Sequence, residues 1–318
     1  MEKIYFLSDW NVPKGYHKFN RFRDPDAYAE LFPWFMITYN DLDEVTNGDN
    51  VIFIKTPADN EFKKLTAIKK IMENNKIFII QESDIFDWFD WSAEEQELYI
   101  DILNKCEAFC YHNEYDRKVM NIFVNKFIKY TSCIGLFIDK PKLFNKGQYV
   151  FLPNPVKRFQ RGMISHKIAS DNISNMPIYS MKYNPPKNHI LSFPDSYKQK
   201  GIELIDRMNE QEWLGFIYGS KFGIDIHREF SGGNCSLEFG SLGVPLIGNI
   251  NLDTQRDIFP DLSFEFNDYD NIKKVINLLL NDKDFFEEVS NKALINTKEK
   301  YNNIHIVEKF KQEINKLL

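Results

Sequence analysis

Glu238 is the residue whose surroundings in the sequence point most directly to ligand chemistry. It lies in the stretch GNCSLEFGSLGVPLIGN, residues 233–249, after a small polar turn and before a short run that predicts a strand. A carboxylate in the first turn of a helix offsets the helix dipole, which is a purely structural role. A carboxylate that faces the end of a neighbouring strand is also placed to hold a ligand by charge-assisted hydrogen bonds. The sequence favours the ligand-binding role for Glu238.

Four side chains able to transfer a proton lie at the ends of predicted strands in the first half of the chain. They are Asp9, Glu82, Asp84 and His112. Carboxyl and imidazole groups are common general acids and bases in enzymes. Taken singly, each of the four is more often a cap or a turn residue. Glu82 and Asp84 are the leading pair, because their loop follows a fully apolar strand.

Cations and aromatic rings are interleaved in residues 10–35, directly after the first predicted strand. The cationic side chains include Lys18, Arg21 and Arg23. Such a mixture suits a sugar acceptor, and it also suits a nucleic acid through phosphate contacts and base stacking. A surface loop whose rings pack on their own domain is the slightly favoured interpretation.

The first half of the chain alternates the strands and helices that must position these side chains. Apolar runs rich in β-branched residues predict strands, and apolar residues at helical spacing predict helices. The predicted strands are 4–9, 51–56, 76–83 and 107–112, and the predicted helices are 61–75, 92–106 and 114–127. A parallel sheet covered by helices on both faces binds ligands beyond the carboxyl ends of its strands. The fold class is therefore α/β.

The second half of the chain predicts a second α/β domain after a hinge at the sequence PNP, residues 153–155. Predicted strands are 189–193, 221–227 and 244–249. A loop entering a helix is predicted for 194–208, and further helices for 210–219, 235–243, 267–282, 284–301 and 303–318. Residues 157–188 carry few periodic signals and receive no assignment.

Composition and charge exclude several classes of protein. The 318 residues carry a formal net charge of −6, which disfavours bulk electrostatic capture of nucleic acid. No signal-peptide segment is recognised, and no apolar run approaches the ~18 residues of a membrane-spanning helix. The four cysteines form no C-x-x-C pair, and Cys110 and His112 are better explained as buried residues than as metal ligands. We expect a cytoplasmic protein with no bound metal.

The order of elements between residues 221 and 282 resembles the C-terminal domain of a GT-B glycosyltransferase of the group 1 type. The strand KFGIDIH leads into a polar loop and then into a helix that carries a glutamate. A Gly-x-Pro sequence, Gly243 to Pro245, and a new strand follow, and SFEFNDYDNIKKVINLLLND matches a later part of the same domain. The resemblance is clear over residues 190–300 and topological before them. It implies two Rossmann-like domains that face each other across a cleft, with the C-terminal helix packed back on the N-terminal domain.

The resemblance also implies a division of labour between the domains. Residues 1–153 would bind the acceptor, residues 154–302 would bind a nucleotide-diphosphate sugar, and residues 303–318 would form the returning helix. The glutamate would accept hydrogen bonds from the ribose hydroxyls, and the diphosphate would lie near helix N-termini and cations. The implied donor-binding residues are Glu238, Ser236, Gly233, Asn234, Lys198, Lys200, Arg228 and Glu229. The implied acceptor-binding residues are Lys18, Arg21, Arg23 and His112, and the catalytic candidates are Glu82, Asp84 and Asp9.

Many retaining members of the family carry two glutamates with seven residues between them. This chain departs from that pattern at the first of the two. Counting back from Glu238 gives Phe230, and Glu229 lies one place earlier. The sequence therefore leaves open whether the configuration of the sugar is retained or inverted.

The sequence thus predicts a glycosyltransferase that moves a sugar from a nucleotide-diphosphate sugar to a hydroxyl group. A UDP-sugar is favoured over a GDP- or ADP-sugar as co-substrate, with no bound cofactor, and the acceptor would be a glycan, a lipid-linked sugar or a protein. One alternative is a phage-type enzyme that glycosylates a hydroxymethylated DNA base. Others are a nucleotide-sugar epimerase and a non-catalytic protein that binds a nucleotide-sugar or a partner. The donor sugar, the acceptor and the oligomeric state stay open.

Overall fold

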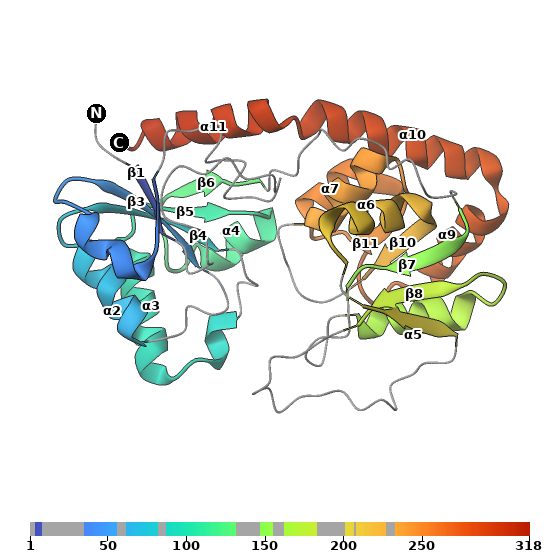
Figure 1. The fold of residues 1–318 in the computed structure, drawn as a ribbon, viewed down its shortest axis with the longest axis horizontal. Coiled ribbons are helices and arrows are strands. Elements are labelled where there is room, and N and C mark those ends of the chain that lie inside the picture. The colour runs from blue at the N-terminus through green and yellow to red at the C-terminus, as the bar shows by residue number, and fades with distance from the viewer. Residues whose placement is uncertain are drawn as a thin grey trace. The chain divides into compact units, whose positions relative to one another are not determined.

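The computed structural model divides the chain into two compact units, which are considered separately (Figure 1). The first comprises Met1–Gly135 and Asn303–Leu318, and the second comprises Leu136–Glu229 and Gly233–Asn302. The structure describes residues 4–7, 35–55, 62–81, 87–131, 147–154, 162–182, 201–206, 208–226 and 233–318.

The first unit is built on a parallel sheet whose six described strands lie in the order β2-β1-β3-β4-β5-β6. The strands are β1 (Ile4–Leu7), β2 (Phe35–Ile37), β3 (Asn50–Lys55), β4 (Lys76–Gln81), β5 (Ala108–Tyr111) and β6 (Phe127–Lys129). The helices are η1 (Tyr39–Glu44), α2 (Phe62–Ile71), η2 (Asp87–Asp90), α3 (Ala93–Lys105), α4 (Glu114–Met120) and α11 (Asn303–Asn315).

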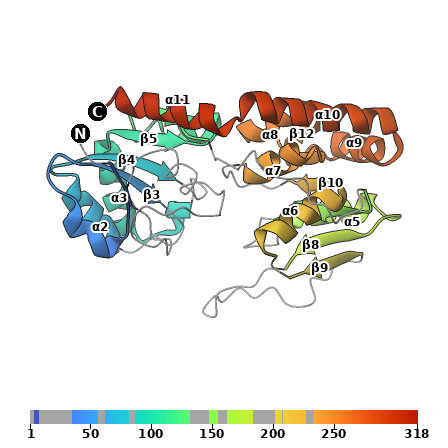
Figure 2. The same cartoon turned by 45° about the horizontal axis from the view of Figure 1, so that its top comes forward.

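Alternate residues of these strands point to opposite faces of the sheet and are buried on both. The helix α11 covers one face, in a core that includes Phe6, Ile52, Phe78, Val307, Phe310 and Ile314. The helices α2 and α3 cover the other face, in a core that includes Val51, Phe53, Ile77, Leu65, Ile68, Tyr99 and Ile102. Figures 1 and 2 show α11 and the α2–α3 pair on opposite sides of the sheet. The resemblance implied this packing for the C-terminal helix.

The local signals in the sequence explain where α3 begins. Ser92 caps the helix: its hydroxyl accepts a hydrogen bond from the backbone N–H of Glu95 at 3.3 Å. The Glu95 carboxylate accepts one from the backbone N–H of Ser92 at 3.0 Å. This reciprocal pair satisfies two backbone donors that the first turn of a helix leaves unpaired.

The second unit contains another parallel sheet, with six described strands in the order β12-β11-β10-β7-β8-β9. The strands are β7 (Tyr149–Leu152), β8 (Ile178–Met181), β9 (Ile202–Ile205), β10 (Ser220–Asp225), β11 (Leu246–Asn249) and β12 (Ser263–Phe264). The helices are α5 (Met163–Asn172), α6 (Glu210–Gly219), α7 (Asn234–Leu242), α8 (Asp253–Ile258), η5 (Pro260–Leu262), α9 (Tyr269–Asn281) and α10 (Lys283–Lys300). Contacts place α5 with α9, and α6 and α10 with α7.

The strand order of the second sheet is that of a Rossmann fold. Going outward from β7, the chain builds β8 and β9 on one side, and then β10, β11 and β12 on the other. The order reverses between β7 and β10, which are neighbours. In sheets of this kind a ligand binds beyond the carboxyl ends of the strands at the point of reversal.

Three expectations from the sequence differ from the structure. The domain boundary expected after residue 153 is too late, because β7, which ends at Leu152, is a central strand of the second sheet. The helix expected within 194–208 is wrong in its described part, since Gly201 has a φ of 91° and leads into the edge strand β9. The helix expected at 114–127 ends at Met120, and the short strand β6 follows.

The segment 157–188, which received no assignment, contains α5 and β8 in its described part. The strand expected at 189–193 lies outside the described residues. In the part of the chain that the structure describes, no helix has the length and apolar character to cross a membrane.

Candidate functional site

A hydrogen bond between two side chains joins the carboxyl ends of β7 and β10, where the strand order of the second sheet reverses. Asn154, two residues beyond β7, donates a hydrogen bond from its side-chain amide to the carboxylate of Asp225, the last residue of β10. Asp225 is only 4% exposed. The two strand ends that border the predicted ligand position are therefore fixed relative to each other.

The first turn of α5 is fastened to the same edge of the sheet by Ser165. The Ser165 hydroxyl donates to the backbone carbonyl of Ile226 at 2.9 Å and accepts from its backbone N–H at 2.8 Å. Next to it, a ring nitrogen of His166 lies 2.8 Å from the hydroxyl of Ser180. Burial lowers the pKa of His166 to about 4, so its imidazole is neutral at neutral pH. Ser165 therefore joins α5 to the end of β10, and His166 joins α5 to β8.

Gly233 directly precedes α7 and has a backbone conformation that only glycine adopts without strain. Gly233 has a φ of 73°, and a Cβ atom added there would lie 1.8 Å from the hydroxyl oxygen of Thr254. The next residue, Asn234, is the first of α7, and its side-chain carbonyl oxygen is buried without a hydrogen-bond partner among the described residues. The start of α7 thus presents a close-packed glycine and an unsatisfied polar atom.

Ser236, which is predicted to contact the donor, makes an internal hydrogen bond in this structure. Its hydroxyl donates to the side-chain carbonyl of Gln255 at 2.8 Å, and both residues are buried. Gln255 in turn donates to the backbone carbonyl of Leu246 at 2.8 Å. Ser236 therefore ties α7 to α8 and β11.

Glu238 lies in the second turn of α7, and the expectation that it lies in the first turn is wrong. The helix begins at Asn234, and its first turn contains no acidic residue. The helix dipole acts mainly within the first turn, so it does not account for an acid at this position. Glu238 is 3% exposed, and its Oε2 accepts a hydrogen bond of 2.8 Å from the indole N–H of Trp213.

Trp213 is a residue that the sequence analysis missed. It is the fourth residue of α6, and its ring lies 5.2 Å from the ring of Phe151 in β7. Because α6 returns from the carboxyl end of β9 to the amino end of β10, its first turn lies at the carboxyl edge of the sheet. The signal that could have identified it is a tryptophan in the first turn of a predicted crossover helix.

Several predicted donor-side residues lie outside the described part of the chain. They are Lys198, Lys200, Arg228 and Glu229. The strand β9, which follows Gly201, begins at the amino edge of the sheet, away from Asn154 and Asp225. The sequence directly after β7, by contrast, contains Lys157, Arg158 and Arg161, which the assignment of 153–155 as a hinge left unconsidered.

The catalytic and acceptor-side candidates fall mostly outside the described residues as well. These are Asp9, Glu82, Asp84, Lys18, Arg21 and Arg23. The strands β1 and β4, which precede Asp9 and Glu82, are present in the first sheet as expected.

His112 is the first-unit candidate that the structure describes. It follows directly after β5 at the carboxyl edge of the first sheet and is 8% exposed. Its ring makes an edge-to-face contact with Tyr130, at 5.0 Å between centroids, and Tyr130 contacts Phe310 of α11 at 5.3 Å. The ammonium of Lys129 donates to the backbone carbonyl of His112 at 2.5 Å. The imidazole therefore packs on Tyr130, which in turn packs on α11.

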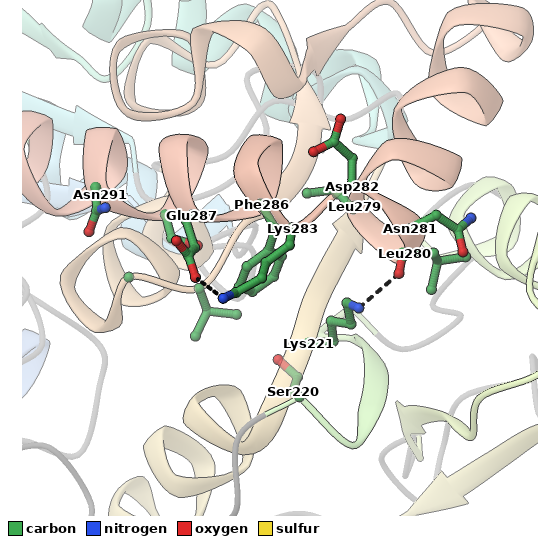
Figure 3. A pocket seen from close by; sticks show the side chains of 14 residues that line it. Ser220, Lys221, Leu279, Leu280, Asn281, Asp282, Lys283, Phe286, Glu287 and Asn291 are labelled. Carbon is green, nitrogen blue, oxygen red and sulfur yellow. Dashed lines mark hydrogen bonds and ion pairs between the residues drawn. The ribbon is translucent and has the colours of Figure 1, made fainter.

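A pocket of about 540 Å³ in the second unit is separate from all these residues (Figure 3). It opens at the amino ends of β7, β10 and β11, and α9 and α10 form its far wall. Lys221 in this pocket donates to the backbone carbonyl of Leu280 at 3.0 Å, and Lys283 pairs with Glu287 at 3.4 Å. A ligand of a Rossmann fold binds at the opposite edge, so we do not assign the donor site to this pocket.

No group of three or more histidine, cysteine, aspartate or glutamate side chains that could hold a metal ion is found within the described ranges. The carboxyl edge of the second sheet instead offers backbone N–H groups at the start of α7 and a buried carboxylate. Groups of this kind suit anionic and hydroxyl ligands.

Comparison with known proteins identifies the fold. No family model matches the chain, and no curated protein matches it. The crystal structure of the S. aureus TarM G117R mutant in complex with Fondaparinux, alpha-GlcNAc-glycerol and UDP is similar, with a TM-score of 0.66 and 15% identity. The match covers 87% of this chain and 58% of that one, so the chain spans less than two thirds of TarM.

Two further solved structures show the same likeness. An E. coli trehalose-6-phosphate protein bound with UDP-2-fluoro glucose matches with a TM-score of 0.62 and 10% identity, over 87% of this chain and 74% of that one. The pneumococcal O-GlcNAc transferase GtfA, in complex with UDP and GlcNAc, matches with a TM-score of 0.60 and 10% identity, over 86% and 58%. Together with the two parallel sheets, these likenesses show that the chain has the GT-B fold of two Rossmann-like α/β units.

Proposed function

We propose that this protein is a glycosyltransferase that moves a sugar from a nucleotide-diphosphate sugar, most favourably a UDP-sugar, to an acceptor hydroxyl. The observation that carries the proposal is the buried carboxylate of Glu238 near the carboxyl edge of a Rossmann sheet. An ionised carboxylate at such a depth costs free energy unless it is hydrogen bonded. The indole N–H of Trp213 already donates one such bond, and the two hydroxyls of a ribose would add further donors. The UDP named with the structures of TarM and GtfA supports the same class of donor.

The diphosphate of the donor would lie at the start of α7. Backbone N–H groups and the helix dipole favour an anion there. The buried carbonyl oxygen of Asn234 would accept a hydrogen bond from the donor. We also propose that cations from the sequence after β7, namely Lys157, Arg158 or Arg161, and Arg228 stabilise the departing diphosphate.

The acceptor would bind the first unit, where a base must take the proton of its hydroxyl group as the sugar is transferred. The candidates remain Glu82, Asp84, Asp9 and His112. The position of His112 at the carboxyl edge of the first sheet supports its inclusion. Lys18, Arg21 and Arg23 remain candidates for acceptor binding. A DNA acceptor rests on the same three cations and is the less favoured choice, because the chain is acidic overall.

Calorimetric titration with UDP, GDP, ADP and their sugars tests the proposal. We expect UDP and a UDP-sugar to bind, and release of UDP when an acceptor is added. Glu238→Ala should weaken UDP binding at least tenfold, whereas Glu287→Ala, which removes an exposed carboxylate on α10, should not change it. Failure of every nucleotide to bind the unaltered protein would rule out the proposed function.

A further inference from the structure

We propose that Trp213 is the positioning residue that directs the Glu238 carboxylate toward the ribose of the bound nucleotide. This inference rests on the proposed function and adds a specific residue to its donor site. The contact that carries it is the hydrogen bond of 2.8 Å from the indole N–H of Trp213 to Oε2 of Glu238. The two residues come from different crossover helices, α6 and α7, which pack side by side.

Both helices begin at the carboxyl edge of the second sheet, so the pair lies near the edge of the sheet where the nucleotide would bind. The start of α6 is fixed by Asn209, whose side-chain carbonyl accepts from the backbone N–H of Glu212 at 3.0 Å. The Glu212 carboxylate accepts from the backbone N–H of Asn209 at 2.9 Å. Such a reciprocal cap fixes the first turn of the helix, which contains Trp213.

The indole ring is held by packing that does not involve Glu238. It makes an edge-to-face contact with Phe151, at 5.2 Å between ring centroids. Phe151 also contacts Phe216 of α6 at 5.2 Å and stacks on Phe239 of α7 at 6.4 Å. Aromatic contacts of this kind stabilise a fold by more than the burial of their surface area alone accounts for. The indole ring therefore has a packing contact in this aromatic cluster that is independent of its hydrogen bond to Glu238.

The chemistry of the two groups makes this orientation useful. An indole N–H donates one hydrogen bond and accepts none, whereas a carboxylate accepts several through its two oxygens. A donor held on Oε2 of Glu238 restricts rotation of the carboxylate about its last bond before a ligand arrives. Preorganisation of this kind raises affinity because less conformational freedom is lost on binding. It also offsets the cost of keeping the carboxylate buried and charged.

A double-mutant cycle on UDP binding tests the proposal, with Trp213→Phe, Glu238→Gln and the double variant measured by calorimetry. Trp213→Phe keeps an aromatic ring against Phe151 and removes the N–H donor together with part of the ring. We expect it to raise the Kd for UDP about tenfold, which corresponds to about 1.4 kcal/mol. In the Glu238→Gln background the same change should alter the Kd less than about twofold, because the oriented carboxylate is already gone.

The matched control is Phe216→Leu, on the same helix and in the same aromatic cluster. It loosens the packing without removing a donor, and we expect it to lower the melting temperature while changing the Kd for UDP less than about twofold. A spectroscopic readout needs no ligand. In protein labelled with ¹⁵N-tryptophan, the indole N–H resonance that Trp213→Phe removes should shift in Glu238→Gln and again when UDP is added.

The outcomes separate this inference from the proposed function. UDP binding that Trp213→Phe leaves unchanged, or that it weakens equally in the presence and absence of Glu238, overturns the role of Trp213 alone. An indole resonance that Glu238→Gln does not shift also overturns it. If the unaltered protein binds no nucleotide, the donor site itself is refuted, and the role of Trp213 with it.

Discussion

The hydroxyl of Ser165 forms two hydrogen bonds with the backbone of a single residue, Ile226, donating to its carbonyl at 2.9 Å and accepting from its N–H at 2.8 Å. Ile226 directly follows β10, and Ser165 lies in the first turn of α5. Both residues are buried. One side chain therefore satisfies the backbone of the residue at which the sheet ends and the proposed nucleotide-binding loop begins.

Replacing Ser165 with alanine should destabilise the protein and weaken nucleotide binding. The change leaves a buried backbone donor and acceptor unpaired, and each such group costs about 1–3 kcal/mol. Urea denaturation monitors stability, and titration with UDP monitors binding. The matched control is Ser170→Ala, which removes a hydroxyl bonded to the Lys167 carbonyl on the same helix. That change should cost less than about 0.5 kcal/mol, and equal costs for the two variants would contradict the prediction.

Gly233→Ala should be among the most damaging single changes in the second unit. The added Cβ would lie 1.8 Å from the hydroxyl oxygen of Thr254, at a φ of 73°. We expect a loss of stability well above the roughly 1 kcal/mol that a left-handed conformation alone costs an L-residue. Gly48→Ala provides the control, because Gly48 has a φ of 91° but nothing lies within 4 Å of its added Cβ. A similar melting temperature for both variants would show that the contact with Thr254 is relieved without cost.

The buried His166 should make stability depend on pH. Burial lowers its pKa from 6.5 to about 4 in the folded protein, so the unfolded chain binds the proton more readily. The contribution of His166 is therefore complete above about pH 6.5 and is lost as the pH falls toward 4. The full difference corresponds to about 3 kcal/mol.

Urea denaturation at pH 7, 5.5 and 4.5 measures this dependence. His166→Gln should flatten it, whereas His305→Gln, which changes an exposed residue of α11, should leave it as it was. A dependence that survives the removal of His166 would assign the effect to another group.

Phe310→Ala should destabilise the first unit by about 3–5 kcal/mol, the usual cost of truncating a buried phenylalanine. Phe310 is 1% exposed and packs on Tyr130, which contacts His112. The exposed neighbour Lys309 is the control, and its replacement with alanine should have little effect. Circular dichroism during heating measures both. If Phe310→Ala melts like the unaltered protein, α11 does not contribute to the core as described.

The sequence predicted the elements whose signals are local. The helix predicted at 92–106 begins at the cap formed by Ser92 and Glu95, and the helix predicted at 235–243 ends at Gly243, which has a φ of 64°. The central strands β3, β4, β10 and β11 were recognised from their apolar runs. In each of these places, the cap, the periodicity and the burial indicate the same structure.

The elements that the sequence misassigned depend on contacts from elsewhere in the chain. The strand β9 contains Ile202, Leu204 and Ile205, which fit a helical period as well as an edge strand, and pairing with β8 decides the matter. The strand β7 was obscured by the prolines that follow it, which suggested a hinge. The partnership of Trp213 with Glu238 was invisible because 25 residues separate them.

The first unit is closed by its most distant segment, since α11 covers the face of the sheet that contains Phe6, Ile52 and Phe78. During synthesis on the ribosome these side chains emerge before the helix that shields them, which begins at Asn303, more than 200 residues after Phe78. The second unit is nearly continuous in sequence, from Leu136 to Asn302, and can complete its core before α11 is translated. Until α11 has been translated, the first unit therefore exposes this apolar face of its sheet, and a chaperone could bind there.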